Sequence, residues 1–316
     1  MPRLSPLPPE LPPRFSVAQA KALGVAPSRL RRDDIRRPFH GARAIGAETD
    51  ATVLETCLEF APRLAPWQFF SHETAFGLIG APTPDWPYRP RIHVSAHRPA
   101  REPRTRGIVG HRLQLREPAT IVLPNGLPIE HPVRAWRQVA SLWRIDDLVA
   151  LTDFLLSDRG RVPLASVDEL AAEVETMGDV RGGILRRALA QARSGVRSPR
   201  ETRLRLMLVR AGLPEPEVNW TLRDDSGLRV AELDLAYPRW HVAPEYDGRV
   251  HAADAAQFAK DADRWDAIRA AGWDHVRILN HHLRDGGRPA VAKVRDALIR
   301  AGWRPGQGRQ VPVSFA

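Results

Sequence analysis

The stretch RVAELDLAYPRWHVAPEYDG, residues 229–248, decides the fold that we predict for the C-terminal part of this chain. Within it, residues 231–235 (AELDL) alternate between apolar and charged side chains, which is the pattern of a strand with one buried face. A second apolar run follows the proline, so the sequence predicts two antiparallel strands joined around Arg239–Trp240. The residues that face each other are then Asp234 with Glu245, and Glu232 with Asp247.

This register gathers up to four acids on one face, while Leu233 and Leu235 point to the other face. Carboxylates that face each other across two strands repel, which destabilises the pair. A hard divalent cation such as Mg²⁺, with Mn²⁺ as an alternative, binds carboxylate oxygens and would remove this repulsion. The other interpretation is a solvated acidic face without a function.

The segments on both sides of this hairpin complete a recognisable order of elements. Upstream, the segment 198–219 predicts a helix that ends at AGLPEP (211–216), and Ser198, Pro199 and Glu201 occupy the N-cap, N1 and N3 positions of its capping box. Glu201 either serves only this cap or also helps to hold metal or water. Downstream, residues 254–272 predict a helix, 273–279 a strand and 288–302 a closing helix. The order α-β-β-β-α-β-α predicts a mixed sheet flanked by helices.

This order, together with Asp234, Glu245-Tyr-Asp247-Gly248 and His251, resembles the PD-(D/E)XK nuclease superfamily over about residues 195–303. The nearest resemblance is to domains grouped with very-short-patch repair endonucleases. It implies that Asp234 and Glu245 are the metal-binding acids and that the helix of Glu201 supplies a further acid. It also implies that His251 lies close to a catalytic histidine.

Two residues depart from the superfamily pattern. Asp247 occupies the position of its strand lysine, and we keep Asp247 among the candidate catalytic residues. Lys260, on the following helix, either replaces that lysine or is an ordinary surface residue. Pro244 interrupts a strand that we expect to be central, where a ladder hydrogen bond would be lost.

The charge of the chain favours a polyanionic partner. The 316 residues carry 47 Lys or Arg against 37 Asp or Glu, a net charge of +10. Two segments, 1–45 and 89–117, concentrate this excess, which is typical of proteins that bind nucleic acid. The alternative is a general enrichment in arginine, since lysine occurs only at positions 21, 260 and 293.

The first basic segment predicts a winged helix-turn-helix over residues 14–48. Ser16 is a suitable N-cap, Gly24 ends the first helix, residues 27–35 offer a second short helix, and residues 36–45 offer a wing. The alternative is a helical hairpin with a solvated basic face. The candidate phosphate contacts are Arg29, Arg31, Arg32, Arg36 and Arg37.

Residues 49–160 predict a small mixed α/β domain. We expect helices in ATVLETCLEFAP (51–62) and WQFFSHETAFGLIGAP (67–82), then short strands within 91–131, and then helical periodicity over 132–156. Over residues 14–160 the chain resembles actinobacterial relatives of abortive-infection type IV antitoxins, on SHETAFGLIGAPTP, GLPIEHPVRAWRQVA and DDLVALTDFLL. The resemblance implies a winged-helix DNA-binding domain followed by a small α/β domain.

The histidines and the glutamate of this middle domain raise the question of a second site. Relatives often carry Thr-x-x-Asp where this chain has Trp136 and Gln138, which argues against an enzymatic role for the domain. We therefore assign a structural role to His72, Glu73 and His93 and predict no metal there.

The predicted fold class is a multidomain α+β or α/β protein. Its parts are a Pro-rich arm (1–13), the winged helix-turn-helix (14–48), the antitoxin-like domain (49–160), a helical linker (161–194) and a nuclease-like domain (195–316). The single cysteine, Cys57, and the lack of a long apolar run fit a cytoplasmic, nucleoid-associated protein. We expect DNA as the partner, leave a homodimer open and identify no toxin partner.

Two functions follow from these observations. The favoured one is a Mg²⁺-dependent DNA endonuclease of repair or defence, in which Asp234 and Glu245 hold the metal and His251 accepts a proton from water. Lys260 or a nearby arginine would offset the negative charge that grows at phosphorus. The alternative is a non-catalytic DNA-binding regulator, antitoxin-like, with a degenerate nuclease fold.

Overall fold

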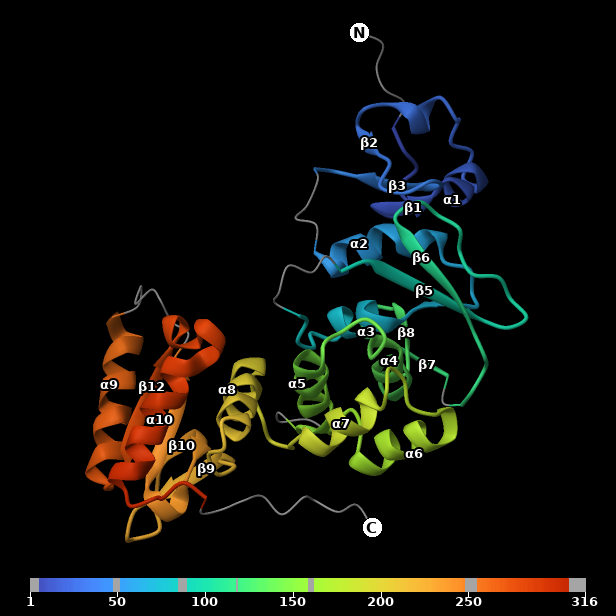
Figure 1. Cartoon of the computed structure of the whole chain (residues 1–316). Coiled ribbons are helices and arrows are strands. Elements are labelled where there is room, and N and C mark those ends of the chain that lie inside the picture. Colours follow the sequence, from blue (N-terminus) through green and yellow to red (C-terminus); the bar gives the residue numbers. More distant parts are fainter. Residues whose placement is uncertain are drawn as a thin grey trace. The chain divides into compact units, whose positions relative to one another are not determined.

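The computed structural model describes residues 6–47, 52–84, 90–117, 119–158, 162–247 and 255–306, without the side chains of 255–260. The chain divides into two compact units, residues 1–142 and 143–316, and each combines helices with strands (Figure 1). The predicted mixed α and β class is therefore confirmed. Among the described residues, no helix combines the length and the apolar character needed to cross a bilayer.

A three-stranded antiparallel sheet with the order β1-β3-β2 opens the first unit. Its elements are β1 (Arg14–Ser16), α1 (Val17–Ala22), a 3₁₀ helix (Arg29–Arg31), β2 (Ile35–Arg36) and β3 (Ala42–Ile45). Ser16 caps α1 in a complete capping box with Gln19. The expected second helix is only one 3₁₀ turn, and β2 and β3 pair as antiparallel strands in the region predicted as a wing (36–45). The small core of this part contains Phe15, Ala20, Leu30 and Ile35.

A five-stranded mixed sheet with the order β6-β5-β4-β8-β7 forms the rest of the first unit. The elements are α2 (Val53–Phe60), a 3₁₀ helix (Ala61–Arg63), β4 (Gln68–Phe70), α3 (His72–Leu78), β5 (Ile92–His97), β6 (Ile108–Leu113), β7 (Thr120–Val122), β8 (Pro128–Glu130) and α4 (Pro132–Val139). The prediction of one helix over 67–82 holds only for α3, since Gln68–Phe70 is a strand that pairs with β5. The sequence did not reveal this strand because a short apolar run has no periodicity that separates a strand from a helix.

Four helices begin the second unit: α5 (Ile145–Leu156), α6 (Val167–Met177), α7 (Ile184–Gln191) and α8 (Pro199–Arg210). A buried ionic network joins α5 to α8. Arg205 donates to Asp153 at 3.0 Å, and the hydroxyl of Thr202 donates to the same oxygen at 2.8 Å. Both charged side chains are at most 2% exposed. The helices at 145–191 are therefore packed against the segment that begins the predicted nuclease-like domain.

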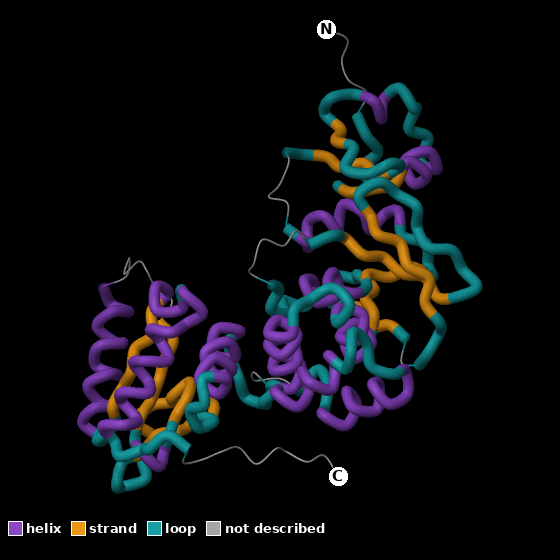
Figure 2. Tube along the Cα trace, in the orientation of Figure 1, coloured by secondary structure: helices purple, strands orange, loops and turns teal. Residues whose placement is uncertain are grey.

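The remaining elements follow the predicted order after α8. They are β9 (Glu217–Arg223), β10 (Arg229–Ala236), a 3₁₀ helix (Pro238–Trp240), β11 (Val242–Asp247), α9 (Ala255–Ala270), β12 (Asp274–Leu279), two 3₁₀ helices (Asn280–Leu283, Asp285–Gly287) and α10 (Arg288–Arg300). The pair β9–β10 is antiparallel and the pair β11–β12 is parallel. Figure 2 shows these strands with helices around them.

The predicted hairpin register holds at the base of β10 and β11, but the ladder does not continue. Tyr237 and Val242 form an isolated antiparallel bridge, in which Tyr237 N–H donates to Val242 at 2.8 Å and Val242 N–H donates back at 3.4 Å. Backbone N–H groups alternate between the two neighbours of a strand, so the next N–H toward β10 belongs to residue 244. Pro244 has none. This explains why two two-stranded sheets replace the single sheet that we expected.

Helices cover both faces of these strands. One apolar cluster joins α8 and α10 to Leu235, Val242, Val276 and Ile278. The other joins Ile268 of α9 to residues that include Leu233 and Ala243. The ends of β10 and β11 that carry the predicted acids therefore lie within a layered core, where solvent is partly excluded.

Candidate functional site

Asp234 of β10 is the most strongly perturbed acid of the predicted site. Burial raises the pKa of its carboxyl group, and the charges of Glu201 and Glu245 raise it further, to about 7. Arg264 and Arg197 oppose this shift without cancelling it. Among the described residues, no hydrogen bond to the carboxylate of Asp234 is formed. Three acids from α8, β10 and β11 thus act on one another.

Glu245, across from Asp234 in the hairpin register, is held by two basic side chains. Nη1 of Arg264 donates to both carboxylate oxygens at 2.7 and 2.9 Å, and Nε2 of His275 donates to Oε2 at 2.8 Å. Burial raises the pKa of Glu245, but hydrogen bonds from His275 and Arg264 outweigh it, so the pKa is lowered. Glu245 is therefore the firmly ionised member of the group.

Glu201 lies buried in the first turn of α8 and only partly fulfils its predicted capping role. Its backbone N–H donates to the hydroxyl of Ser198 at 3.2 Å, as expected for an N3 residue. Its own Oε2 accepts from the backbone of Arg197 at 3.0 Å, so the reciprocal bond to Ser198 is absent from this cap. The carboxylate is consequently fixed near the helix N-terminus while its charge acts on Asp234.

The two outer acids of the hairpin are neutralised by arginines. Glu232 pairs with Arg229 at 2.5 Å and also with Arg197. Asp247 accepts from Arg277 at 2.6 Å, and the guanidinium of Arg277 lies 3.8 Å from the ring centre of Trp265. These pairs offset the repulsion that we predicted between Glu232 and Asp247. With Glu232 and Asp247 paired to arginines, the acids that remain in the candidate site are Glu201, Asp234 and Glu245.

Two predicted residues cannot be placed, and two others were missed. His251 lies outside the described residues, and Lys260 lies in α9 with a side chain outside them. His275 and Arg264, which contact Glu245, were not among the predicted residues. His275 becomes a neighbour only because β11 and β12 pair in parallel, with Ala243 beside His275. A local sequence pattern cannot predict which strands pair, so the sequence did not reveal this contact.

The oxygen donors of the three-acid group suit a hard divalent cation in kind, but the ligand atoms of Glu201, Asp234 and Glu245 do not all lie within 4.8 Å of one another, so a cation would have to draw them together. Carboxylate oxygens are the protein ligands that Mg²⁺ and Mn²⁺ prefer. Asp234 supplies a carboxylate without a hydrogen-bond partner among the described residues, and burial, followed by the charges of Glu201 and Glu245, raises its pKa. Both oxygens of Glu245 are already engaged, so a cation there would compete with Arg264.

The predicted phosphate contacts of the N-terminal sheet fall into two groups. Arg29 forms a bidentate pair with Asp34 at 2.9 and 2.7 Å, and Arg36 pairs with Glu59 at 2.6 Å. The guanidinium of Arg37 donates to the backbone of Arg31. The side chains that remain exposed without a protein partner among the described residues are those of Arg31 and Arg32.

A second basic surface lies in a cavity of about 730 Å³ between α8 and α10. Arg210 and Arg203 line it, and they form ion pairs with Asp146 at 2.6 Å and Asp147 at 2.9 Å. Arg288 and Arg295 of α10 also line it, and among the described residues neither has an acidic partner. Helix α8 therefore carries Glu201 near its beginning and arginines of this cavity further along.

Comparisons with known proteins identify relatives but no function. No protein-family model matches the chain, and no solved structure does. Two similar proteins are uncharacterised proteins from two strains of Mycobacterium tuberculosis. Each is 25% identical over 240 residues, which cover 76% of this chain and 87% of the relative.

Proposed function

We propose that this protein is a Mg²⁺-dependent DNA endonuclease that hydrolyses phosphodiester bonds, with Mn²⁺ as an alternative ion. The observation that carries this proposal is the pKa of Asp234, raised to about 7 by burial and by the charges of Glu201 and Glu245. Carboxylates forced together in a partly dry core are destabilising unless a cation or a proton is shared among them. The element order and the resemblance to PD-(D/E)XK nucleases support the same activity.

The roles of the residues follow from their contacts. Asp234 and Glu201 would bind the cation with Glu245, whose carboxylate is oriented by Arg264 and His275. When bound, Mg²⁺ polarises a phosphate oxygen and lowers the pKa of water. His251 remains our candidate for accepting the proton of that water. Arg264 joins Lys260 as a candidate for offsetting the charge that develops on phosphate.

DNA would be held by basic surfaces away from the acids. Arg31 in the first unit, and Arg288 and Arg295 in the second, form no ion pair with a described acid, and Arg32 is an exposed arginine whose charge also acts on Asp34. Phosphate contacts of this kind supply affinity without sequence information. This division of labour agrees with a protein of repair or defence that works on DNA in the cytoplasm.

A second function is favoured by one specific observation. Both carboxylate oxygens of Glu245 are bound by Arg264, and Asp247 stands where the superfamily has its lysine. A DNA-binding regulator with a degenerate nuclease fold would retain such internal ion pairs and would need no metal. The two functions predict the same DNA binding and differ only in cleavage.

Plasmid cleavage separates them. The full chain is incubated with supercoiled plasmid in Mg²⁺, in Mn²⁺ and in chelator, beside Asp234→Asn and the control Asp225→Asn, an exposed acid in the β9–β10 turn. We expect metal-dependent nicking or linearisation that falls at least about 100-fold in Asp234→Asn and is unchanged in the control, because a lost metal ligand removes transition-state stabilisation. Wild-type protein that binds DNA but never cuts it would instead identify the regulator.

The phosphate contacts have their own test. The double change Arg31→Ala and Arg32→Ala is expected to weaken binding to all duplex sequences and to reduce the slope of log affinity against log salt by about 2, near 0.9 for each contact. Arg29→Ala, which removes a side chain already paired with Asp34, is the matched control. An unchanged salt slope in the double variant would exclude Arg31 and Arg32 as the phosphate contacts.

A further inference from the structure

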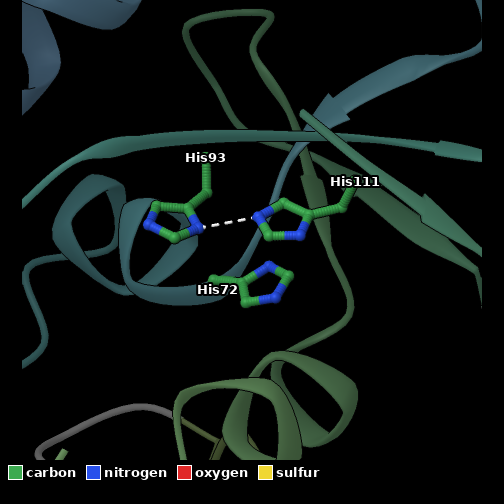
Figure 3. A group of neighbouring side chains, drawn as sticks. All are labelled: His72, His93 and His111. Atoms are coloured by element: carbon green, nitrogen blue, oxygen red, sulfur yellow. Dashed lines mark hydrogen bonds between the residues drawn. The ribbon is translucent and has the colours of Figure 1, made fainter. Parts of the chain in front are cut away.

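Three histidines meet in the first unit, on neighbouring elements of the five-stranded sheet. His93 lies on β5 and His111 on β6, and the parallel register pairs Ser95 with His111, so the two rings share one face of the sheet. His72 begins α3 directly after β4, which pairs with the other edge of β5. Figure 3 shows the three side chains turned toward one another.

The rings are close enough for their nitrogens to share one ligand. Nδ1 of His93 lies 2.9 Å from Nε2 of His111 (Figure 3), and ligand atoms of all three residues lie within 4.8 Å of one another. The ring of His72 stacks on that of His111, with 3.9 Å between centroids. At this distance one of the two nitrogens carries a hydrogen and donates it to the lone pair of the other.

Protein groups engage the outward nitrogens of two rings. The hydroxyl of Ser71 lies 2.9 Å from Nδ1 of His72, which leaves Nε2 as its ligand atom. Oε1 of Glu73 lies 3.4 Å from Nε2 of His93, the nitrogen opposite to the one that faces His111. A carboxylate behind a histidine is the usual arrangement that orients a metal-binding imidazole.

The cluster is largely shielded from solvent, since His72 and His93 are buried and His111 is half-buried. Its three imidazoles are a nitrogen donor set, unlike the carboxylates of the second unit.

The backbone of His72 is strained in a way that places its ring in the cluster. Its φ is 52°, in the left-handed region that non-glycine residues rarely adopt. The backbone N–H of His72 donates to Oε1 of Gln138 at 3.0 Å, and Nε2 of Gln138 donates to Glu130 at 3.0 Å. Gln138, predicted to mark an inactive domain, thus holds the conformation that brings the third histidine to the other two.

We propose that His72, His93 and His111 form a transition-metal site that takes Zn²⁺. Three imidazoles match the protein ligands of zinc sites that keep a fourth position for water. The metal would replace the hydrogen atom between His93 and His111 and would widen their nitrogen–nitrogen distance from 2.9 Å to about 3.3 Å, as tetrahedral coordination requires. The ring of His72 would turn out of its stack to direct Nε2 at the ion. This replaces the purely structural role that we predicted for His72 and His93.

Metal binding by the full chain tests this site. Protein stripped with a chelator is titrated with Co²⁺, followed by visible absorption, and with Zn²⁺ in competition with a chromogenic chelator. We expect one equivalent per chain and the intense visible bands of low-symmetry, tetrahedral Co²⁺. His111→Gln is expected to weaken Zn²⁺ binding more than about 100-fold, and Glu73→Gln, which removes an orienting charge, by about 10–100-fold. His97→Gln, at the end of the same strand as His93, is expected to bind as the wild type does.

A second variant tests the site even if His111→Gln disturbs folding. His111→Cys retains a zinc-ligating atom and is expected to bind Co²⁺ with an additional sulfur charge-transfer band. Wild-type protein that takes up no stoichiometric Zn²⁺ or Co²⁺ overturns the proposal, and so does a folded His111→Gln variant with wild-type affinity. The result is independent of the proposed nuclease, because Asp234→Asn leaves this site intact and plasmid cleavage in Mg²⁺ does not require it.

Discussion

Asp234 shows how a single residue reports the chemistry around it. Its neighbours in the strand, Leu233 and Leu235, are buried, and its own side chain is half-buried, which disfavours the charged form of the carboxyl. Glu201 and Glu245 then raise its pKa, whereas Glu245 itself is kept ionised by Arg264 and His275. Two acids that face each other thus have pKa values shifted in opposite directions, which is typical of functional carboxylate groups.

This difference makes the stability of the metal-free protein depend on pH. The folded state holds the proton of Asp234 up to about pH 7, whereas the unfolded chain releases it near 3.8. The stabilising contribution is therefore present at low pH and is lost as pH rises toward 7. We expect Asp234→Asn to gain stability relative to wild type over this window, by up to about 1.4 kcal/mol for each pH unit and less where solvent screens the group.

Urea unfolding of both proteins in chelator, at pH 5 and pH 8, measures the effect. Asp225→Asn, which replaces an exposed acid of the same hairpin, should show no such trend. A difference between Asp234→Asn and wild type that stays constant from pH 5 to pH 8 would show that the carboxyl of Asp234 has an ordinary pKa.

At the scale of elements, helix α8 connects the acids to the helical layer. Arg205 of α8 is 2% exposed and pairs with Asp153 of α5, while Arg210, one turn further along, is 45% exposed and pairs with Asp146. Both arginines thus link α8 to α5, Arg205 through a buried ion pair and Arg210 through an ion pair exposed to solvent. Removing one partner of a buried pair leaves an uncompensated charge behind.

We expect Arg205→Met to destabilise the second unit by about 3–5 kcal/mol, because Asp153 would remain buried and unpaired by an arginine. Arg210→Met should change the free energy of unfolding by at most about 1 kcal/mol, since exposed pairs are screened by water. Chemical denaturation of the two variants beside wild type gives both values. Equal effects of the two substitutions would contradict the buried network.

Much of this architecture was predicted from the sequence, and the features that the prediction missed were missed for physical reasons. Alternation in β10 and the cap at Ser198 are local signals, and both elements form where expected. The parallel pairing of β11 with β12 involves residues about thirty positions apart, so no local pattern specifies it. His275 and His111 were missed for this reason, because their partners lie on neighbouring strands rather than nearby in the chain.

At the scale of the whole molecule, the compact unit that contains the acids begins at residue 143. The sequence placed the start of the nuclease-like domain at residue 195, after the helical segment. Yet Arg205, Thr202 and the backbone of Arg193 all bind the carboxylate of Asp153 on α5. A domain cut at residue 195 would keep the buried Arg205 and lose its partner.

We therefore expect a fragment of residues 143–316 to fold cooperatively and a fragment of 195–316 to be unstable or molten. Circular dichroism, limited proteolysis and urea unfolding compare the two. If 195–316 unfolds with the same midpoint as 143–316, the helices at 145–191 do not contribute to the stability of the acidic site.

The central claim is that Asp234, with Glu201 and Glu245, holds a divalent cation, and Mn²⁺ binding followed by electron paramagnetic resonance tests it most directly. Mn²⁺ prefers the oxygen ligands of this group over the imidazoles of the first unit. The full chain is predicted to bind one Mn²⁺ that Mg²⁺ displaces, with affinity reduced at least about tenfold in Asp234→Asn and unchanged in Asp225→Asn and His111→Gln. Unchanged Mn²⁺ affinity in Asp234→Asn, or no bound Mn²⁺ in the wild type, would contradict the account.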